Sequence, residues 1–218
     1  TVILMSSHKH KTIARDISWL SFNGRVLQEA ADNSVPLQER IRFLGIFSNN
    51  LDEFFRVRVA ALKRMMKFGA KAHMHLELDP QQILDEIQMI VLNQQSEFNR
   101  IWQIIQQQLK KEKIFLKTER ELTEEQQEAV RKYYDEEVSA NIIPLMIESI
   151  PNFPQLRDKS IYLGVVMWQK ESALKKKYAL IEIPSRVLGR FFQLPSSKPD
   201  EHHIILLEDV IRFNLPDI

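Results

Sequence analysis

An asparagine stands inside a strongly apolar helical pattern in the first third of the chain. Steps of four and three residues along that pattern predict one stripe, made of Phe43, Phe47, Asn50, Phe54, Val57 and Ala61. A buried side-chain amide costs free energy unless its donors and its acceptor are paired. Asn50 is therefore either bonded within the fold or free to meet a ligand.

Two acidic residues follow Asn50, and their spacing favours a structural role. Asp52 and Arg56 lie four residues apart, which suits an ion pair on one helix face, and Glu53 lies on the side of Val57. Nothing nearby completes a set of metal ligands. We therefore expect neither a catalytic residue nor a metal site here.

Residues 56–71 contain six cations and no acid. Such a run predicts a face that attracts a polyanion. The alternative is a solvated helix face, because charge runs commonly serve solubility. Nucleic acid is the weaker polyanion candidate, because the neighbouring aromatic residues fall in the apolar seam and do not alternate with the cations. The candidate residues of this basic face are Arg56, Lys63, Arg64 and Lys67.

Histidines and glycines complete no catalytic motif in this sequence. His73 and His75 are two residues apart, which does not fit the spacing of a helical ligand pair, and the pair His202 and His203 lies at an expected strand entrance. The chain has only five glycines and no glycine-rich phosphate loop. Phosphotransfer by these residues alone is not expected.

Composition places the chain among ordinary globular proteins. Its 218 residues are 44% hydrophobic and 27% charged, with a net charge of +1. The absence of cysteine excludes disulfides and thiolate metal sites and fits a reducing compartment. No apolar stretch approaches the roughly 20 residues of a membrane-spanning helix. We expect a cytoplasmic protein, in solution or associated with a membrane surface.

The first half predicts an antiparallel bundle of three helices over residues 15–112, after a flexible tail at 1–14. Asp16 or Ser18 can cap the first helix, and Pro36 suits the first turn of the second. Asp79 and Pro80 open the third helix after a loop at 71–78. The face expected to be buried on the first helix consists of Trp19, Phe22, Val26 and Ala30. A second buried seam on the second helix consists of Leu37, Ile41, Leu44, Ser48, Leu51, Phe55, Arg58, Leu62 and Met65.

The second half predicts an incomplete α+β unit over residues 113–218, so that the whole chain is an α+β multidomain protein. Thr123 and Gln126 form a capping-box pattern that opens a helix to about residue 140. Segments 160–168 and 178–183 are rich in β-formers and suggest a hairpin with a longer loop that contains three lysines. Residues 190–194 and 203–207 could add strands, and a helix starts at 209.

Three segments of the first half carry a family resemblance. Residues 18–23 (SWLSFN), 25–32 (RVLQEAAD) and 48–54 (SNNLDEF) are similar to the amino-terminal signature of the bacterial polyphosphate kinases, and residues 180–185 extend the likeness. Gly24 stands where the family usually has a larger polar residue, a departure that we expect to affect helix propensity rather than chemistry.

This resemblance implies an amino-terminal fragment of an enzyme that moves the terminal phosphoryl group of ATP onto polyphosphate, and back. The helical domain would supply one wall of the nucleotide site, and the α+β head domain, truncated here, would help to form a homo-oligomer. Catalytic histidines and the magnesium site would lie in later domains, so this chain alone should lack catalytic residues. ATP, ADP and polyphosphate are the implied partners.

The resemblance also assigns a role to Asn50, the second asparagine of the SNNLDE motif. It implies that the amide contacts the adenine edge, with apolar contact from the surrounding phenylalanines. Asn50→Ala should then weaken ATP binding and leave folding nearly intact. The rival interpretation is a non-catalytic helical interaction module with an appended α+β domain.

Overall fold

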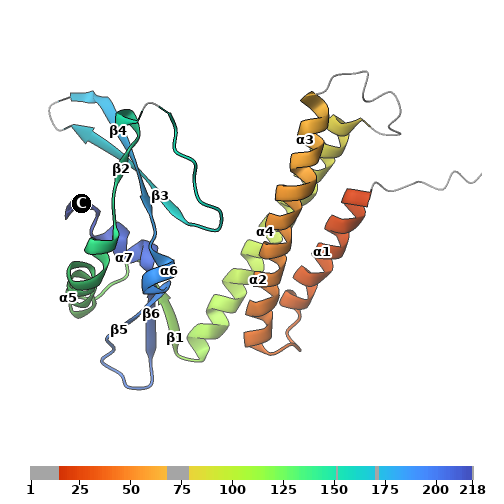
Figure 1. Cartoon of the computed structure of the whole chain (residues 1–218). Coiled ribbons are helices and arrows are strands. Elements are labelled where there is room, and N and C mark those ends of the chain that lie inside the picture. Colours follow the sequence, from red (N-terminus) through yellow and green to blue (C-terminus); the bar gives the residue numbers. More distant parts are fainter. Residues whose placement is uncertain (1–14, 68–78, 151, 170–171, 218) are drawn as a thin grey trace, which may run out of the picture. The chain divides into compact units, whose positions relative to one another are not determined.

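The computed structural model describes residues 15–67, 79–150, 152–169 and 172–217 (Figure 1). The chain divides into two compact units, Thr1–Gln108 and Leu109–Ile218. The expected tail at 1–14 and the expected loop at 71–78 lie outside the described residues.

The first unit is helical, and its helices lie side by side in Figure 1. One rod, formed without interruption by α2, η1 and α3, lies beside α1, and α4 contacts α1 directly through Gln94. Together these helices make the antiparallel bundle predicted from the periodicity (Figure 1). The elements are α1 (Arg15–Ala31), α2 (Leu37–Phe54), the π-helical turn η1 (Phe55–Val59), α3 (Ala60–Lys67) and α4 (Pro80–Lys111).

Helix α1 buries a different face from the one expected. Phe22 is 59% exposed, whereas Asn23 is completely buried. The buried positions follow steps of three and four from Ile17, so the face is rotated from the predicted stripe by about one residue. The residues that define it are Ile17, Leu20, Asn23, Leu27 and Ala30.

The π-helical turn η1 corrects the predicted stripe on the second helix. A π turn holds more residues than an α turn, so it rotates every later side chain around the helix axis. Phe54 and Val59 are therefore both buried although they are five residues apart. Val57 is 47% exposed, so the predicted stripe fails after Phe54. Of the predicted second seam, Phe55 and Met65 are exposed, whereas Leu62 is buried as expected.

Helix α4 begins as predicted at Pro80, and Asp79 accepts a hydrogen bond from the backbone nitrogen of Gln81 (3.1 Å). Farther along, Gln94 donates from Nε2 to the backbone oxygen of Leu20 in α1 (2.8 Å). A Cβ atom at Gly24 would lie 3.0 Å from that nitrogen. Gly24 therefore affects the packing of α1 against α4 as well as helix propensity.

The second unit combines short helices with two small sheets. Strand order is β1-β6-β5 in one sheet and β2-β4-β3 in the other. β1 pairs in parallel with β6, and the remaining strand pairs are antiparallel. The strands are β1 (Ile114–Lys117), β2 (Leu145–Met146), β3 (Tyr162–Gln169), β4 (Ser172–Glu182), β5 (Phe191–Leu194) and β6 (His202–Leu206). The helices and helical turns are α5 (Glu124–Tyr133), η3 (Tyr134–Val138), η4 (Ser139–Asn141), η5 (Ile147–Ser149), α6 (Ser185–Leu188), α7 (Leu207–Phe213) and η6 (Leu215–Asp217).

Local signals in the second unit act as predicted at α5 but not in the hairpin. The Thr123 hydroxyl accepts from the Gln126 backbone nitrogen, and Gln126 accepts in return from the backbone nitrogen of Thr123, which completes the capping box. The predicted longer hairpin loop is wrong, because strand β4 begins at Ser172 and includes the lysines. Pairing of Trp168 with Lys176 carries the ladder through that segment.

One apolar core holds the second unit together. Helices α5 and α7 and both sheets contribute to it, with Val130, Ile205 and Val210 completely buried. Burying branched side chains between helices and sheet faces stabilises such a layered unit. The chain is thus an α+β protein in which a helical bundle precedes an α+β unit.

Two valines of the same π turn test this fold. Val59→Ala should lower the free energy of unfolding by about 2 kcal/mol, because it removes buried methyl groups from a side chain that is 5% exposed. Val57→Ala, at a position that is 47% exposed, should stay within about 0.5 kcal/mol of the unmodified chain. Chemical denaturation followed by circular dichroism measures both. Equal losses would contradict the π turn.

Candidate functional site

Asn50 lies on α2 beside Asn23 of α1, and their amides are bonded in series. Asn50 donates from Nδ2 to Oδ1 of Asn23 (3.0 Å), and Asn23 donates from its own Nδ2 to the backbone oxygen of Phe47 (3.3 Å). Asn23 is completely buried, and Asn50 is half-buried. The amide of Asn50 is therefore fixed on one side by the fold.

An aromatic pair lies one helical turn from the amide pair. The rings of Trp19 and Phe54 stack with their centroids 4.8 Å apart and their planes 14° apart. Trp19 precedes Asn23 by four residues in α1, and Phe54 follows Asn50 by four residues in α2. Antiparallel helices bring such positions together. The sequence segments 18–23 and 48–54 thus meet across a single helix interface.

The bond to Asn23 argues against the expectation that Asn50→Ala leaves folding nearly intact. Loss of the Asn50 amide would leave Oδ1 of Asn23 unpaired in a completely buried position. On its other side, Oδ1 of Asn50 accepts no hydrogen bond from any residue that the structure describes. Asn50 is therefore both a structural residue and a residue with a free acceptor.

The phenylalanines around Asn50 differ from the expected apolar wall. Phe47 and Phe54 are each 2% exposed, and Phe47 packs inward with its ring centroid 5.9 Å from that of Phe98. These rings fill the bundle and present no face to a ligand. Ile46, 40% exposed and one turn before Asn50, and the half-buried Phe43, two turns before it, are apolar side chains of α2 that remain near the surface.

The acidic residues after Asn50 form the predicted ion pair. Nη2 of Arg56 lies 2.6 Å from Oδ2 of Asp52, and Nη1 lies 3.6 Å from Oε2 of Glu53. All three side chains are exposed, so the pairs contribute little to stability. Arg56 is largely neutralised, which makes it the weakest of the four candidates for a polyanion face.

The other cations of the basic face are less engaged. Lys63, Arg64 and Lys67 are all exposed on α3, and none of them forms an ion pair with a described residue. Lys63 and Lys67 lie one turn apart and therefore share a side of the helix. Lys71 lies outside the described residues.

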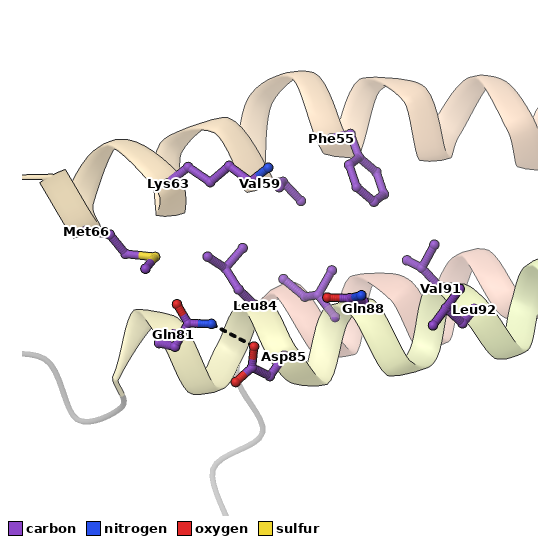
Figure 2. A pocket seen from close by; sticks show the side chains of 11 residues that line it. Phe55, Val59, Lys63, Met66, Gln81, Leu84, Asp85, Gln88, Val91 and Leu92 are labelled. Atoms are coloured by element: carbon purple, nitrogen blue, oxygen red, sulfur yellow. Dashed lines mark hydrogen bonds between the residues drawn. The ribbon is translucent and has the colours of Figure 1, made fainter. Parts of the chain in front are cut away.

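Lys63 also lines a pocket between α3 and the beginning of α4 (Figure 2). Its volume is about 470 Å³. The π turn places Phe55 and Val59 on one wall, and Figure 2 shows them facing Leu84 and Val91 of α4. At one end of the pocket, Gln81 donates from Nε2 to Oδ1 of Asp85 (2.7 Å).

His203 of the second unit is held by structural contacts, whereas its neighbour His202 is exposed. His203 is bonded through Nδ1 to Nε2 of Gln126 (2.9 Å) and through Nε2 to Oε2 of Glu201 (3.1 Å), and its ring packs on that of Phe115. A hydrogen bond from Lys198, followed by the bond from His203, lowers the pKa of the Glu201 carboxyl. In the part of the chain that the structure describes, no cluster of three or more His, Cys, Asp or Glu side chains could hold a metal ion. His8, His10, His73 and His75 lie outside that part.

Two sequence families together match nearly the whole chain. The family described as "Polyphosphate kinase N-terminal domain" matches residues 12–117, and the family described as "Polyphosphate kinase middle domain" matches residues 125–218. This chain belongs to the polyphosphate kinase family. Two of the segments that carry the resemblance, 18–23 and 48–54, contain the hydrogen-bonded residues Asn23 and Asn50.

Individual polyphosphate kinases agree with this membership. The chain is 43% identical to the polyphosphate kinase of Vibrio vulnificus strain YJ016 over 213 residues, which cover 94% of this chain and 29% of the relative. The chain is 40% identical to the polyphosphate kinase of Escherichia coli K12 over 212 residues, which cover 94% of this chain and 30% of the relative. The crystal structure of the polyphosphate kinase from Porphyromonas gingivalis matches this chain with a TM-score of 0.82 at 32% identity. The match covers 94% of this chain and 30% of that one.

The chain thus spans under a third of the length of the polyphosphate kinases that it matches. Among the helices that the structure describes, none has the length and apolar character needed to cross a membrane.

The sequence pattern points to Asn50 but not to Asn23, its hydrogen-bond partner. Asn23 belongs to the same signature, yet the predicted face of α1 passed through Phe22 and left Asn23 aside. The usable signal was a second asparagine in an apolar pattern, spaced with Leu20, Leu27 and Ala30.

The amide pair predicts a stability effect. Asn50→Ala should lower the free energy of unfolding of the chain by about 1–3 kcal/mol, because the buried Oδ1 of Asn23 loses its donor. The matched control is Asn49→Ala, the exposed neighbour on the same helix, which should change stability by less than about 0.5 kcal/mol. Thermal and chemical unfolding measure both variants. Equal stability of the two variants would show that the bond to Asn23 does not hold in solution.

Proposed function

We propose that this chain is the amino-terminal part of an enzyme that reversibly transfers the γ-phosphoryl group of ATP to polyphosphate. Membership of the polyphosphate kinase family supports this activity for the full-length protein. The magnesium ion that such a reaction uses would be bound by later domains of the full-length enzyme, as the family resemblance implies. The role of this chain is then to bind and orient substrates.

The helical unit would supply one wall of the adenine nucleotide site through Asn50. The observation that carries this proposal is the asymmetry of the Asn50 amide. Its Nδ2 is held by buried Asn23, whereas its Oδ1 has no partner among the described residues. An amide offers an acceptor and a donor next to each other, which matches the amino group and N1 of adenine.

Apolar contact with the base would come from the outer side of α2. Ile46, one turn before Asn50, is 40% exposed, and Phe43 is half-buried. A flat base gains free energy when it covers exposed apolar surface of this kind. The buried rings of Phe47 and Phe54 would act indirectly, by holding α2 in place.

The basic face would attract the polyphosphate chain. Lys63, Arg64 and Lys67 are exposed, and the described residues give them no carboxylate partner, so their charges act on nearby anions. The pocket beside Lys63 is apolar on most of its walls and suits no phosphate group itself (Figure 2). The attraction would therefore follow the outer surface of α3.

The second unit would contribute to a homo-oligomer of the full-length enzyme. On one face of the β3–β4 hairpin, Val166 pairs with Tyr178 and Trp168 pairs with Lys176. Val166, Trp168 and Tyr178 are 41%, 61% and 44% exposed, so they form an apolar stripe that a partner can cover. A cytoplasmic location fits a chain without cysteine.

The alternative, a non-catalytic interaction module, draws support from the apolar surface of the helical unit. Phe22, Met89 and Leu92 are all more than half exposed. Surface of this kind is typical of a protein that meets a partner or another domain. A full-length polyphosphate kinase also needs such contacts, so the two functions differ in whether nucleotide binding depends on Asn50.

Nucleotide binding by Asn50 is tested in the full-length polyphosphate kinase that contains this chain. Asn50→Ala should raise the KM for ATP roughly five- to 150-fold, because hydrogen bonds to the base disappear. This range corresponds to a loss of about 1–3 kcal/mol of binding free energy. The KM for polyphosphate should not change. Asn49→Ala is the control and should leave both constants within about twofold of the unmodified enzyme. A loss of stability with an unchanged KM for ATP would make Asn50 purely structural.

The basic face is tested by neutralising Lys63 and Lys67 together. The double variant Lys63→Gln and Lys67→Gln should weaken polyphosphate binding by about three- to tenfold at low salt, with a smaller effect near 0.15 M salt, where charges are screened beyond about 8 Å. Lys132→Gln, which removes one charge from the second unit at an exposed site, is the control. Fluorescence anisotropy of labelled polyphosphate measures binding. Unchanged binding at low salt would assign the face to solubility.

A further inference from the structure

Asn23 uses both ends of its amide inside the helix interface. Its Nδ2 donates to the backbone oxygen of Phe47, and its Oδ1 accepts from Nδ2 of Asn50. The residue is completely buried, so water cannot replace either partner. Each end of the amide therefore needs the partner that it has.

The carbonyl of Phe47 fixes which way round this amide lies. A backbone oxygen can only accept, so the Asn23 end that faces it has to be the NH₂ group. The oxygen of Asn23 then faces Asn50, and Asn50 has to present its own NH₂ group to that oxygen. One backbone oxygen thus sets the orientation of two successive side-chain amides.

We propose that Asn23 is a positioning residue for base selectivity, an inference that rests on the proposed function of Asn50. By holding Nδ2 of Asn50, it commits Oδ1 of Asn50 to act as the acceptor on the ligand side. Rotation of the Asn50 amide by half a turn would break the bond and bring two oxygens together inside the interface.

This orientation discriminates between the purine nucleotides. Adenine carries an amino donor at position 6 beside an acceptor at N1, whereas guanine carries an oxo acceptor beside an N–H donor. A freely rotating amide could match either edge. An amide held by Asn23 matches adenine and opposes its oxygen to that of guanine, and a site with such a mismatch rejects the wrong base because polar groups stay unpaired.

The test uses the full-length enzyme and compares kcat/KM for ATP with kcat/KM for GTP. Asn23→Leu keeps a side chain of similar size but removes the acceptor that holds Asn50. The preference for ATP over GTP should fall about tenfold, through a higher KM for ATP and a lower KM for GTP. Asn23→Ala is the second variant, and its preference should fall in the same direction.

Two further variants separate positioning from stability. Asn23→Asp keeps an oxygen opposite Asn50 and should keep the nucleotide preference within about twofold, although it loses the donor to Phe47 and melts at a lower temperature. Gln94→Leu removes another interhelical bond of α1, the one to the Leu20 oxygen, and should lower the melting temperature without changing the preference.

The outcomes divide clearly. A preference that stays unchanged in Asn23→Leu and Asn23→Ala, or that is lost in Asn23→Asp, would overturn the positioning role. If the positioning role fails in this way but Asn50→Ala still raises the KM for ATP, Asn50 contacts the nucleotide without being oriented by Asn23. If Asn50→Ala leaves the KM for ATP unchanged, the proposed nucleotide contact itself has failed.

Discussion

A buried side-chain amide has to find a partner for each of its ends, and in the helical unit Asn23 meets this requirement across the interface of α1 and α2. Its bonds to Asn50 and to the Phe47 carbonyl can form in only one register of the two helices. Apolar side chains alone would tolerate a slide along the interface, whereas a polar pair among them specifies one alignment. The stacked rings of Trp19 and Phe54, one turn away, then fall into place.

The π turn after Phe54 is the second constraint on this unit. It rotates the rest of the rod, so that Val59 and Leu62 continue the buried side while Phe55 reaches the pocket beside α4. An uninterrupted α-helix would bury Val57 in place of Val59. The π turn therefore decides which cations of α3 face outward and which apolar residues line the pocket. Such turns are frequent near functional sites, and this one begins immediately after the SNNLDEF segment.

Much of the fold was predictable because its local signals are strong. Pro80 begins α4, and Thr123 and Gln126 form a complete capping box. Periodicity failed where its assumption of 3.6 residues per turn failed, at the π turn. It also misplaces the face of α1, because a stripe through the apolar side chains of Trp19 and Phe22 leaves out the polar Asn23, which is completely buried. Three consecutive polar lysines before Tyr178 favour a loop, but strand pairing decides their conformation.

The candidate site was predictable in part. The family signature drew attention to Asn50, but no pattern along one helix could supply its partner on another. A tertiary contact between two asparagines 27 residues apart needs the packed structure. The same contact means that substitution of Asn50 should affect stability as well as nucleotide binding. Nδ2 of its amide is bonded to Asn23, whereas its Oδ1 has no partner among the described residues.

We propose that the Asn50 amide, held by Asn23 at Nδ2 and without a described partner at Oδ1, contacts the adenine base of ATP. The most direct measurement is a crystal structure of the full-length enzyme with a non-hydrolysable ATP analogue. We expect Oδ1 of Asn50 to lie within about 3 Å of the adenine amino nitrogen, with Nδ2 still bonded to Asn23. A base bound away from Asn50, or an Asn50 amide turned so that its oxygen faces Asn23, would contradict it.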